Sequence, residues 1–168
     1  MTSLGVFVYK SLSVAYRAYN DFTLKPFNVL EISPLGGCGQ VLVEFDLESY
    51  QEHIKSYKNF LVHHQFFNNF DSRIIEAYLS LKINPIQEGL LMIEAPFIGN
   101  SFEVAHLALE KNIDIVDLRL FRGENAKCIL FLSAKSLKTL KSFKEEVQKS
   151  FSCELLEQTS LSLKELFA

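Results

Sequence analysis

The chain has 168 residues, of which 48% are hydrophobic and 22% charged, so it can bury a packed core and is not expected to be disordered. The formal net charge is −3, and the Lys-rich stretch at residues 135–149 also carries glutamates, which argues against a nucleic-acid-binding surface. Three scattered cysteines, no secretion signal and no apolar run near the ~18 residues of a membrane span lead us to expect a cytoplasmic protein without a membrane partner.

The first half of the chain predicts alternating strands and helices. Apolar residues recur three and four apart in its helical segments, and Pro26 ends the first helix because proline lacks the N–H that a helix needs. The glycine-rich stretch at residues 33–39 is expected to be a loop. The expected elements are a strand at 6–9, a helix at 13–25, strands at 29–32 and 41–45, a helix capped by Asp46, a strand at 60–67 and a helix at 71–81.

The second half predicts the same order of elements. A polar loop is expected at residues 121–127 (FRGENAK), again after the second strand. The expected elements are a strand at 90–93, a helix at 102–111, strands at 113–120 and 128–132, a helix capped by Ser136, a strand at 153–156 and a helix at 161–167.

This recurrence indicates an internal duplication. Lys25 and Lys111 each end the first helix of their half and lie 86 residues apart, whereas Gln40 and Lys127 lie 87 apart, which implies one inserted residue. The sequence therefore predicts an α+β protein of two tandem ferredoxin-like domains. Each would have a mainly antiparallel four-stranded sheet with helices, and the domains would span residues 1–84 and 85–168, divided near Pro85.

Residues 89–133 contain a distinctive succession of motifs. A glycine, an apolar strand and an acidic residue (GLLMIE) precede an alanine-containing helix that ends in Lys111. A strand (DIVDLRL) and a glycine-containing loop then lead into an apolar strand (RGENAKCILFLS). This segment resembles a bacterial microcompartment shell domain. Residues 21–46 follow the same plan. Residues 67–69 are Phe-Asn-Asn where the family has a basic-Pro-His motif, so the sequence leaves open whether the chain tiles into a shell.

The resemblance implies a structural, self-assembling protein. Tandem members of the family form trimers that mimic a hexamer, with the loops after the second strands gathered at a central pore. It implies a homotrimer, other shell proteins as partners, passage of small polar metabolites and a place in a microcompartment. The implied pore residues are Ser33, Pro34, Leu35, Gly36, Gly37, Cys38, Gly39, Phe121, Arg122, Gly123, Glu124 and Asn125.

Lys25 and Lys111 match the lysine that the family places at subunit edges. The competing interpretation is a solvated lysine near a helix C-terminus, where the helix dipole favours a cation. Three copies of Cys38 around a threefold axis would offer thiolates to a metal or an iron–sulfur cluster. Each chain would contribute only this one cysteine to such a site, which favours a free thiol and no cofactor.

No arrangement typical of an enzyme stands out in the sequence. His63 and His64 are adjacent and so point to opposite faces of a strand, and His53 and His106 have no matching acidic or cysteine cluster. We therefore expect no catalytic residues. The alternative to a shell-type protein is a duplicated ferredoxin-like module with a small-molecule-binding or regulatory role.

Overall fold

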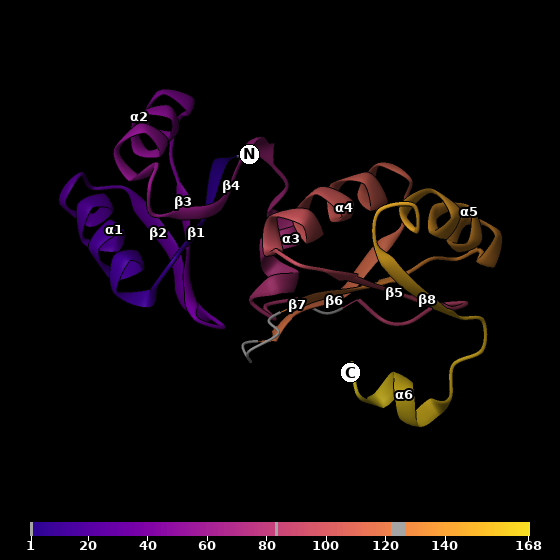
Figure 1. Ribbon diagram of the computed structural model, residues 1–168. Helices are drawn as coiled ribbons and strands as arrows, with labels where there is room; N and C mark the ends of the chain where they lie inside the picture. The colour runs from indigo at the N-terminus through magenta and orange to yellow at the C-terminus, as the bar shows by residue number, and fades with distance from the viewer. Residues whose placement is uncertain (1, 83, 122–126) are drawn as a thin grey trace. The chain divides into compact units, whose positions relative to one another are not determined.

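The computed structural model describes residues 2–82, 84–121 and 127–168, which form two separate four-stranded sheets (Figure 1). Internal contacts divide the chain after Ser72. The first body is called here the N-terminal unit, and the second, residues 73–120 and 127–168, the C-terminal unit.

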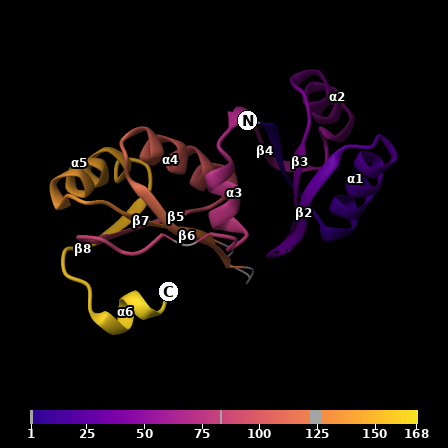
Figure 2. The same cartoon turned by 180° about the vertical axis from the view of Figure 1, so that it is seen from behind.

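The N-terminal unit is a β-α-β-β-α-β fold. Its sheet has the strand order β2-β3-β1-β4, and β1 is antiparallel to both of its neighbours. Helices α1 and α2 lie together on one face of this sheet (Figures 1 and 2). The elements are β1 (Thr2–Tyr9), α1 (Leu12–Leu24), β2 (Asn28–Leu35), β3 (Cys38–Glu44), α2 (Leu47–Tyr57) and β4 (Leu61–Phe70).

Aromatic side chains fill the space between this sheet and its helices. Phe7 of β1 lies at the centre, with ring centroids 5.9 Å from Phe22 of α1, 5.8 Å from Phe45 and 5.4 Å from Tyr50 of α2. Aromatic pairs at such separations add to the stabilisation that area burial alone provides. Asp46 caps α2 as predicted, since its Oδ1 accepts a hydrogen bond of 2.8 Å from the backbone N–H of Ser49.

The C-terminal unit repeats this architecture. Its strand order, β6-β7-β5-β8, is that of the first sheet with every number raised by four. Its elements are α3 (Ser72–Tyr78, which begins at the division), β5 (Leu90–Ala95), α4 (Ile98–Glu110), β6 (Asp114–Phe121), β7 (Lys127–Ser133), α5 (Leu137–Val147), β8 (Ser152–Leu156) and α6 (Leu161–Glu165).

Helices cover both faces of the second sheet. Helices α4 and α5 lie on one face and the short α6 lies on the other (Figures 1 and 2). Just after α6, Phe167 packs on Phe131 of β7 with ring centroids 4.9 Å apart. The guanidinium of Arg119 lies 5.0 Å from the centre of the Phe167 ring. The end of the chain therefore closes an apolar sheet face.

The division after Ser72 comes earlier than the limits 1–84 and 85–168 that the sequence predicts. Tyr78 of α3 packs edge-on against Phe102 of α4 at 5.9 Å, and the side-chain amide of Asn84 donates to the carbonyl of Ile115 at 2.8 Å. Side-chain packing rather than the break at Pro85 thus joins this segment to the C-terminal unit.

The lengths of the elements support the duplication in detail. Helices α1 and α4 have 13 residues each, β2 and β6 have 8, β3 and β7 have 7, and α2 and α5 have 11. The first residues of α1 and α4, and likewise those of β2 and β6, lie 86 residues apart, whereas the first residues of β3 and β7 lie 89 apart. The connection between β6 and β7 is therefore three residues longer than that between β2 and β3, and not one residue longer as the sequence predicts. The predicted fold class, two tandem α+β domains with antiparallel sheets, is confirmed.

Candidate functional site

The stretch at residues 33–39 is a tight β-hairpin rather than a loop. Ser33, Pro34 and Leu35 belong to β2, and Cys38 and Gly39 belong to β3, with Leu35 opposite Cys38. The turn consists of Gly36 and Gly37 alone. Gly36 has φ 59°, the left-handed conformation that the first position of a two-residue hairpin turn requires. The sequence correctly predicts a break between two strands here, but the break is limited to Gly36 and Gly37, and the other five residues of this stretch lie in strands.

The hairpin packs against the start of α1. A Cβ at Gly39 would lie 2.5 Å from the Cβ of Ala15 and 2.9 Å from the Cα of Leu12, so only glycine fits there. Ser33 is buried, and its hydroxyl has no hydrogen-bond partner within the described residues. Cys38 is a half-buried free thiol. The hairpin is therefore closely packed on the rest of its domain.

The second predicted pore segment is only partly visible. Phe121 is the last residue of β6 and is 51% exposed. Arg122, Gly123, Glu124 and Asn125 lie outside the described residues. The structure therefore leaves the pore assignment a prediction.

Lys25 and Lys111 occupy the same place in the two units. Each is the residue that ends the first helix, α1 or α4, and each backbone N–H closes the last turn of that helix. Their side chains differ in their contacts. The ammonium of Lys111 forms an ion pair of 2.8 Å with Glu146 of α5, whereas Lys25 lines a pocket.

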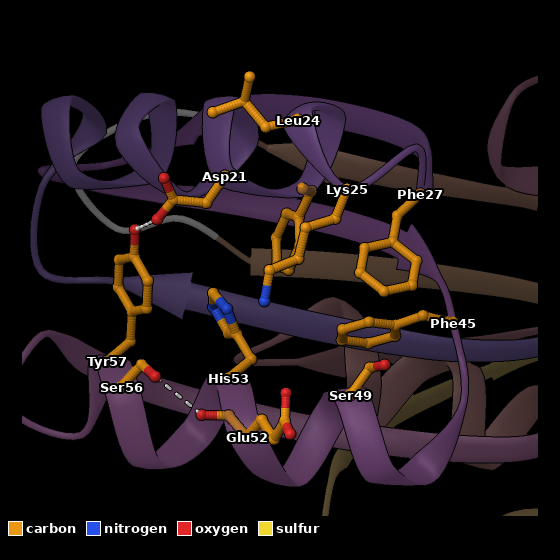
Figure 3. A pocket seen from close by; sticks show the side chains of 11 residues that line it. Asp21, Leu24, Lys25, Phe27, Phe45, Ser49, Glu52, His53, Ser56 and Tyr57 are labelled. Carbon is orange, nitrogen blue, oxygen red and sulfur yellow. Dashed lines mark hydrogen bonds between the residues drawn. The ribbon is translucent and has the colours of Figure 1, made fainter.

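This pocket, called here the His53 pocket, lies between α1 and α2 of the N-terminal unit and has a volume of about 230 Å³ (Figure 3). Sequence reasoning missed it. It is lined by Asp21, Phe22, Leu24, Lys25, Phe27, Phe45, Ser49, Glu52, His53, Ser56 and Tyr57. The sequence does contain a signal for this pocket, since polar residues three and four positions apart lie on one face of a helix. Asp21 and Lys25 have this spacing at the end of one helix. Ser49, Glu52, His53 and Ser56 have it on the next.

His53 lies among aromatic rings at the inner wall of the pocket. Its Nε2 is 2.7 Å from the hydroxyl of Tyr9, and its ring stacks on Tyr57 at 4.4 Å. Burial lowers the pKa of His53 to about 4, with a nearby Asp21 opposing and Lys25 reinforcing this shift. The imidazole is therefore neutral at pH 7.

A second hydrogen-bonded group joins the two helices beside His53. The hydroxyl of Tyr57 donates to Asp21, as Figure 3 shows, and accepts from Nε of Arg17 at 3.4 Å. Burial, followed by the hydrogen bond to Asp21, raises the pKa of Tyr57. The Arg17 guanidinium lies 5.0 Å from the centre of the Tyr57 ring. Arg17 thus offsets the charge of Asp21.

Among the described residues, no three His, Cys, Asp or Glu side chains come close enough together to hold a metal ion. Over the same part of the chain, the helices lack the combined length and apolarity that crossing a bilayer requires.

Comparison with protein-family models gives no match, and comparison with curated proteins gives none either. Among solved structures, a microcompartment protein from Desulfitobacterium hafniense superposes with a TM-score of 0.79. The alignment covers 98% of this chain and 99% of that chain, at 18% sequence identity. The chain has the fold of a microcompartment protein. The resemblance predicted from residues 21–46 and 89–133 is thus confirmed for the fold.

The microcompartment-type fold extends over the whole chain, since the match includes both units. The small subunit of acetolactate synthase from Thermotoga maritima also aligns over 96% of this chain and 99% of that one, at 15% identity, but with a TM-score of 0.32. That value is too low for an inference about this chain.

Proposed function

We propose that the chain is a self-assembling structural protein, a trimeric component of a microcompartment shell or a divergent relative of one. The observation that carries the proposal is the structural match to a microcompartment protein, which covers 98% of this chain and 99% of that chain. Under this proposal the protein has a structural role inside the cell, and its partners are copies of itself and other shell proteins.

The duplication supports a closed assembly. Because each chain has two similar domains, three chains can form a closed ring of six similar domains. Closed symmetry is the usual state of homo-oligomers. Lys25 and Lys111, which end equivalent helices, are proposed to lie near the edges of this ring.

The proposed pore lies where the β2–β3 hairpin and its counterpart at residues 121–127 alternate around the threefold axis. The first would present the backbone of Gly36 and Gly37, and the second would bring Arg122 and Glu124. This lining favours small polar metabolites over apolar ones, and Cys38 remains a free thiol in this account.

Electron cryomicroscopy of the purified full-length protein tests the arrangement. We expect a threefold particle in which Gly36 and residues 121–127 both lie within about one strand length, roughly 17–20 Å, of the axis. A particle with both segments on its outer rim would refute the pore, and a particle without threefold symmetry would refute the assembly.

A further inference from the structure

The two units differ in the side chains between their paired helices, α1 and α2 in one and α4 and α5 in the other. His53 and Phe143 are each the seventh residue of an 11-residue helix, and both are buried. By the same alignment, Tyr57 corresponds to Val147, and Asp21 of α1 corresponds to Leu107 of α4. The N-terminal unit therefore has polar groups where the C-terminal unit has apolar ones.

The helix-end lysines follow the same contrast. Lys111 is held by Glu146, the tenth residue of α5. The tenth residue of α2 is Ser56, whose hydroxyl bonds only to the carbonyl of Glu52 among the described residues. Within the described part of the chain, the ammonium of Lys25 has no hydrogen-bond or ion-pair partner. The acid that neutralises the lysine in one unit is thus missing in the other.

His53 adds a second polar group without a partner. The Tyr9 hydroxyl is fully buried, and its one hydrogen bond among the described residues is to Nε2 of His53. We assign the Tyr9 O–H as the donor of this bond, because a buried O–H without an acceptor costs free energy. The imidazole proton is then on Nδ1, which has no hydrogen-bond partner in the same part of the chain. His53 is only 8% exposed, and it lines the pocket. This N–H is therefore available to donate a hydrogen bond to a ligand or to water in the pocket.

The residues that line the pocket indicate the size and polarity of a ligand that would fit it. The rings of Phe22, Phe27, Phe45 and Tyr57 surround the space, and Figure 3 shows the Lys25 ammonium extending toward His53 between the two helices. A cavity of 150 Å³ lined by apolar side chains already accepts benzene. The volume of about 230 Å³ therefore has room for one ring and a carboxylate.

We propose that the His53 pocket binds a small carboxylate with a compact apolar body, whose anionic group lies between Lys25 and His53. The rings of the walls hold the apolar body. Glu52 opposes the ligand's charge from the outer wall, while Asp21 does so less because Arg17 and Tyr57 occupy it. The ligand is recognised in the N-terminal unit only, so each chain has one site and two non-equivalent domains.

Isothermal titration of the full-length protein with benzoate tests this proposal. Benzamide is the neutral probe of the same shape, benzylamine is the cationic probe, and inorganic phosphate is an anion without an apolar body. We expect saturable binding of benzoate at one site per chain and at least roughly tenfold weaker binding of the other three probes. Benzamide and benzylamine lack the carboxylate that would accept charge-assisted hydrogen bonds. Phosphate has no apolar part to contact the aromatic rings of the pocket. Equal binding of phosphate, or tighter binding of benzylamine, would overturn the proposal, as would no binding of benzoate.

Substitutions identify the site. Lys25→Gln is expected to weaken benzoate binding at least roughly tenfold, and the matched Lys111→Gln to leave it unchanged. Ser56→Glu, which installs the acid found at the equivalent position in α5, should remove binding by pairing with Lys25. Ser56 is exposed, so this variant folds, and circular dichroism checks that it does. Benzoate binding that survives both Lys25→Gln and Ser56→Glu would contradict the assignment.

Discussion

The buried imidazole of His53 makes a specific prediction about acid stability. Burial holds the pKa of His53 at about 4, compared with a usual value of 6.5. Because the pKa is lower in the folded state, the neutral ring stabilises the fold fully above pH 6.5. That stabilisation is lost as the pH falls from 6.5 to 4, since the unfolded chain binds the proton first.

The size of this effect follows from the shift. One pKa unit corresponds to about 1.4 kcal/mol, so His53 contributes up to about 3 kcal/mol to the pH dependence of the free energy of unfolding. The charged groups that face the ring are Asp21 and Lys25 of α1, and the hydroxyls are those of Tyr9 and Tyr57. Asp21 raises the pKa of His53 and Lys25 lowers it, so burial remains the largest cause of the shift.

The perturbation is the double variant Tyr9→Phe/His53→Phe, which removes the imidazole without leaving the buried Tyr9 hydroxyl unpaired. Tyr9→Phe alone is the control, because it keeps the titrating ring. Urea unfolding followed by far-ultraviolet circular dichroism between pH 7 and 4.5 gives the free energies. The double variant should lose less stability than the control, by about 1.4 kcal/mol for each pH unit below 6.5. Identical pH slopes in the two variants would refute the reasoning.

Two further predictions concern packing. Gly39→Ala should lower the free energy of unfolding by about 1–3 kcal/mol, because the new methyl group would lie 2.5 Å from Ala15, whereas Gly37→Ala, with no atom within 4 Å, should cost little in urea unfolding. Phe167→Ala should lower it by about 3 kcal/mol, because Phe167 is only 6% exposed against Phe131 and Arg119. A thermal midpoint unchanged by Phe167→Ala would show that the chain end does not stabilise the sheet.

The succession of elements could be predicted from the sequence because local signals define it. The apolar spacing in α1 and α5, the cap at Asp46 and the glycines after β2 are all contained within a few residues. The recurrence of seven strands and helices in the same order then predicted the tandem fold. The three-residue difference between the β2–β3 and β6–β7 connections was misjudged because no local signal fixes where a strand resumes.

The His53 pocket could not be predicted in the same way. Tyr9, Asp21 and His53 come from three different elements, and only the packing of α1 and α2 on β1 brings them together. The contrast between Ser56 and Glu146 likewise depends on the alignment of α2 with α5, which becomes secure only when both helices are seen to have the same length. The grouping of most of α3 with the C-terminal unit likewise depends on a tertiary contact, that of Tyr78 with Phe102.

Native mass spectrometry of the full-length protein at micromolar concentration tests the assembly most directly. We predict a single species that contains three chains. The number of chains should stay at three when benzoate is added, because closure of the ring does not depend on the pocket. A monomer, or a dimer that forms only with a small molecule, would contradict the shell-type account and favour a duplicated regulatory module instead. The benzoate titration remains a separate test, since the His53 pocket lies within one unit of one chain.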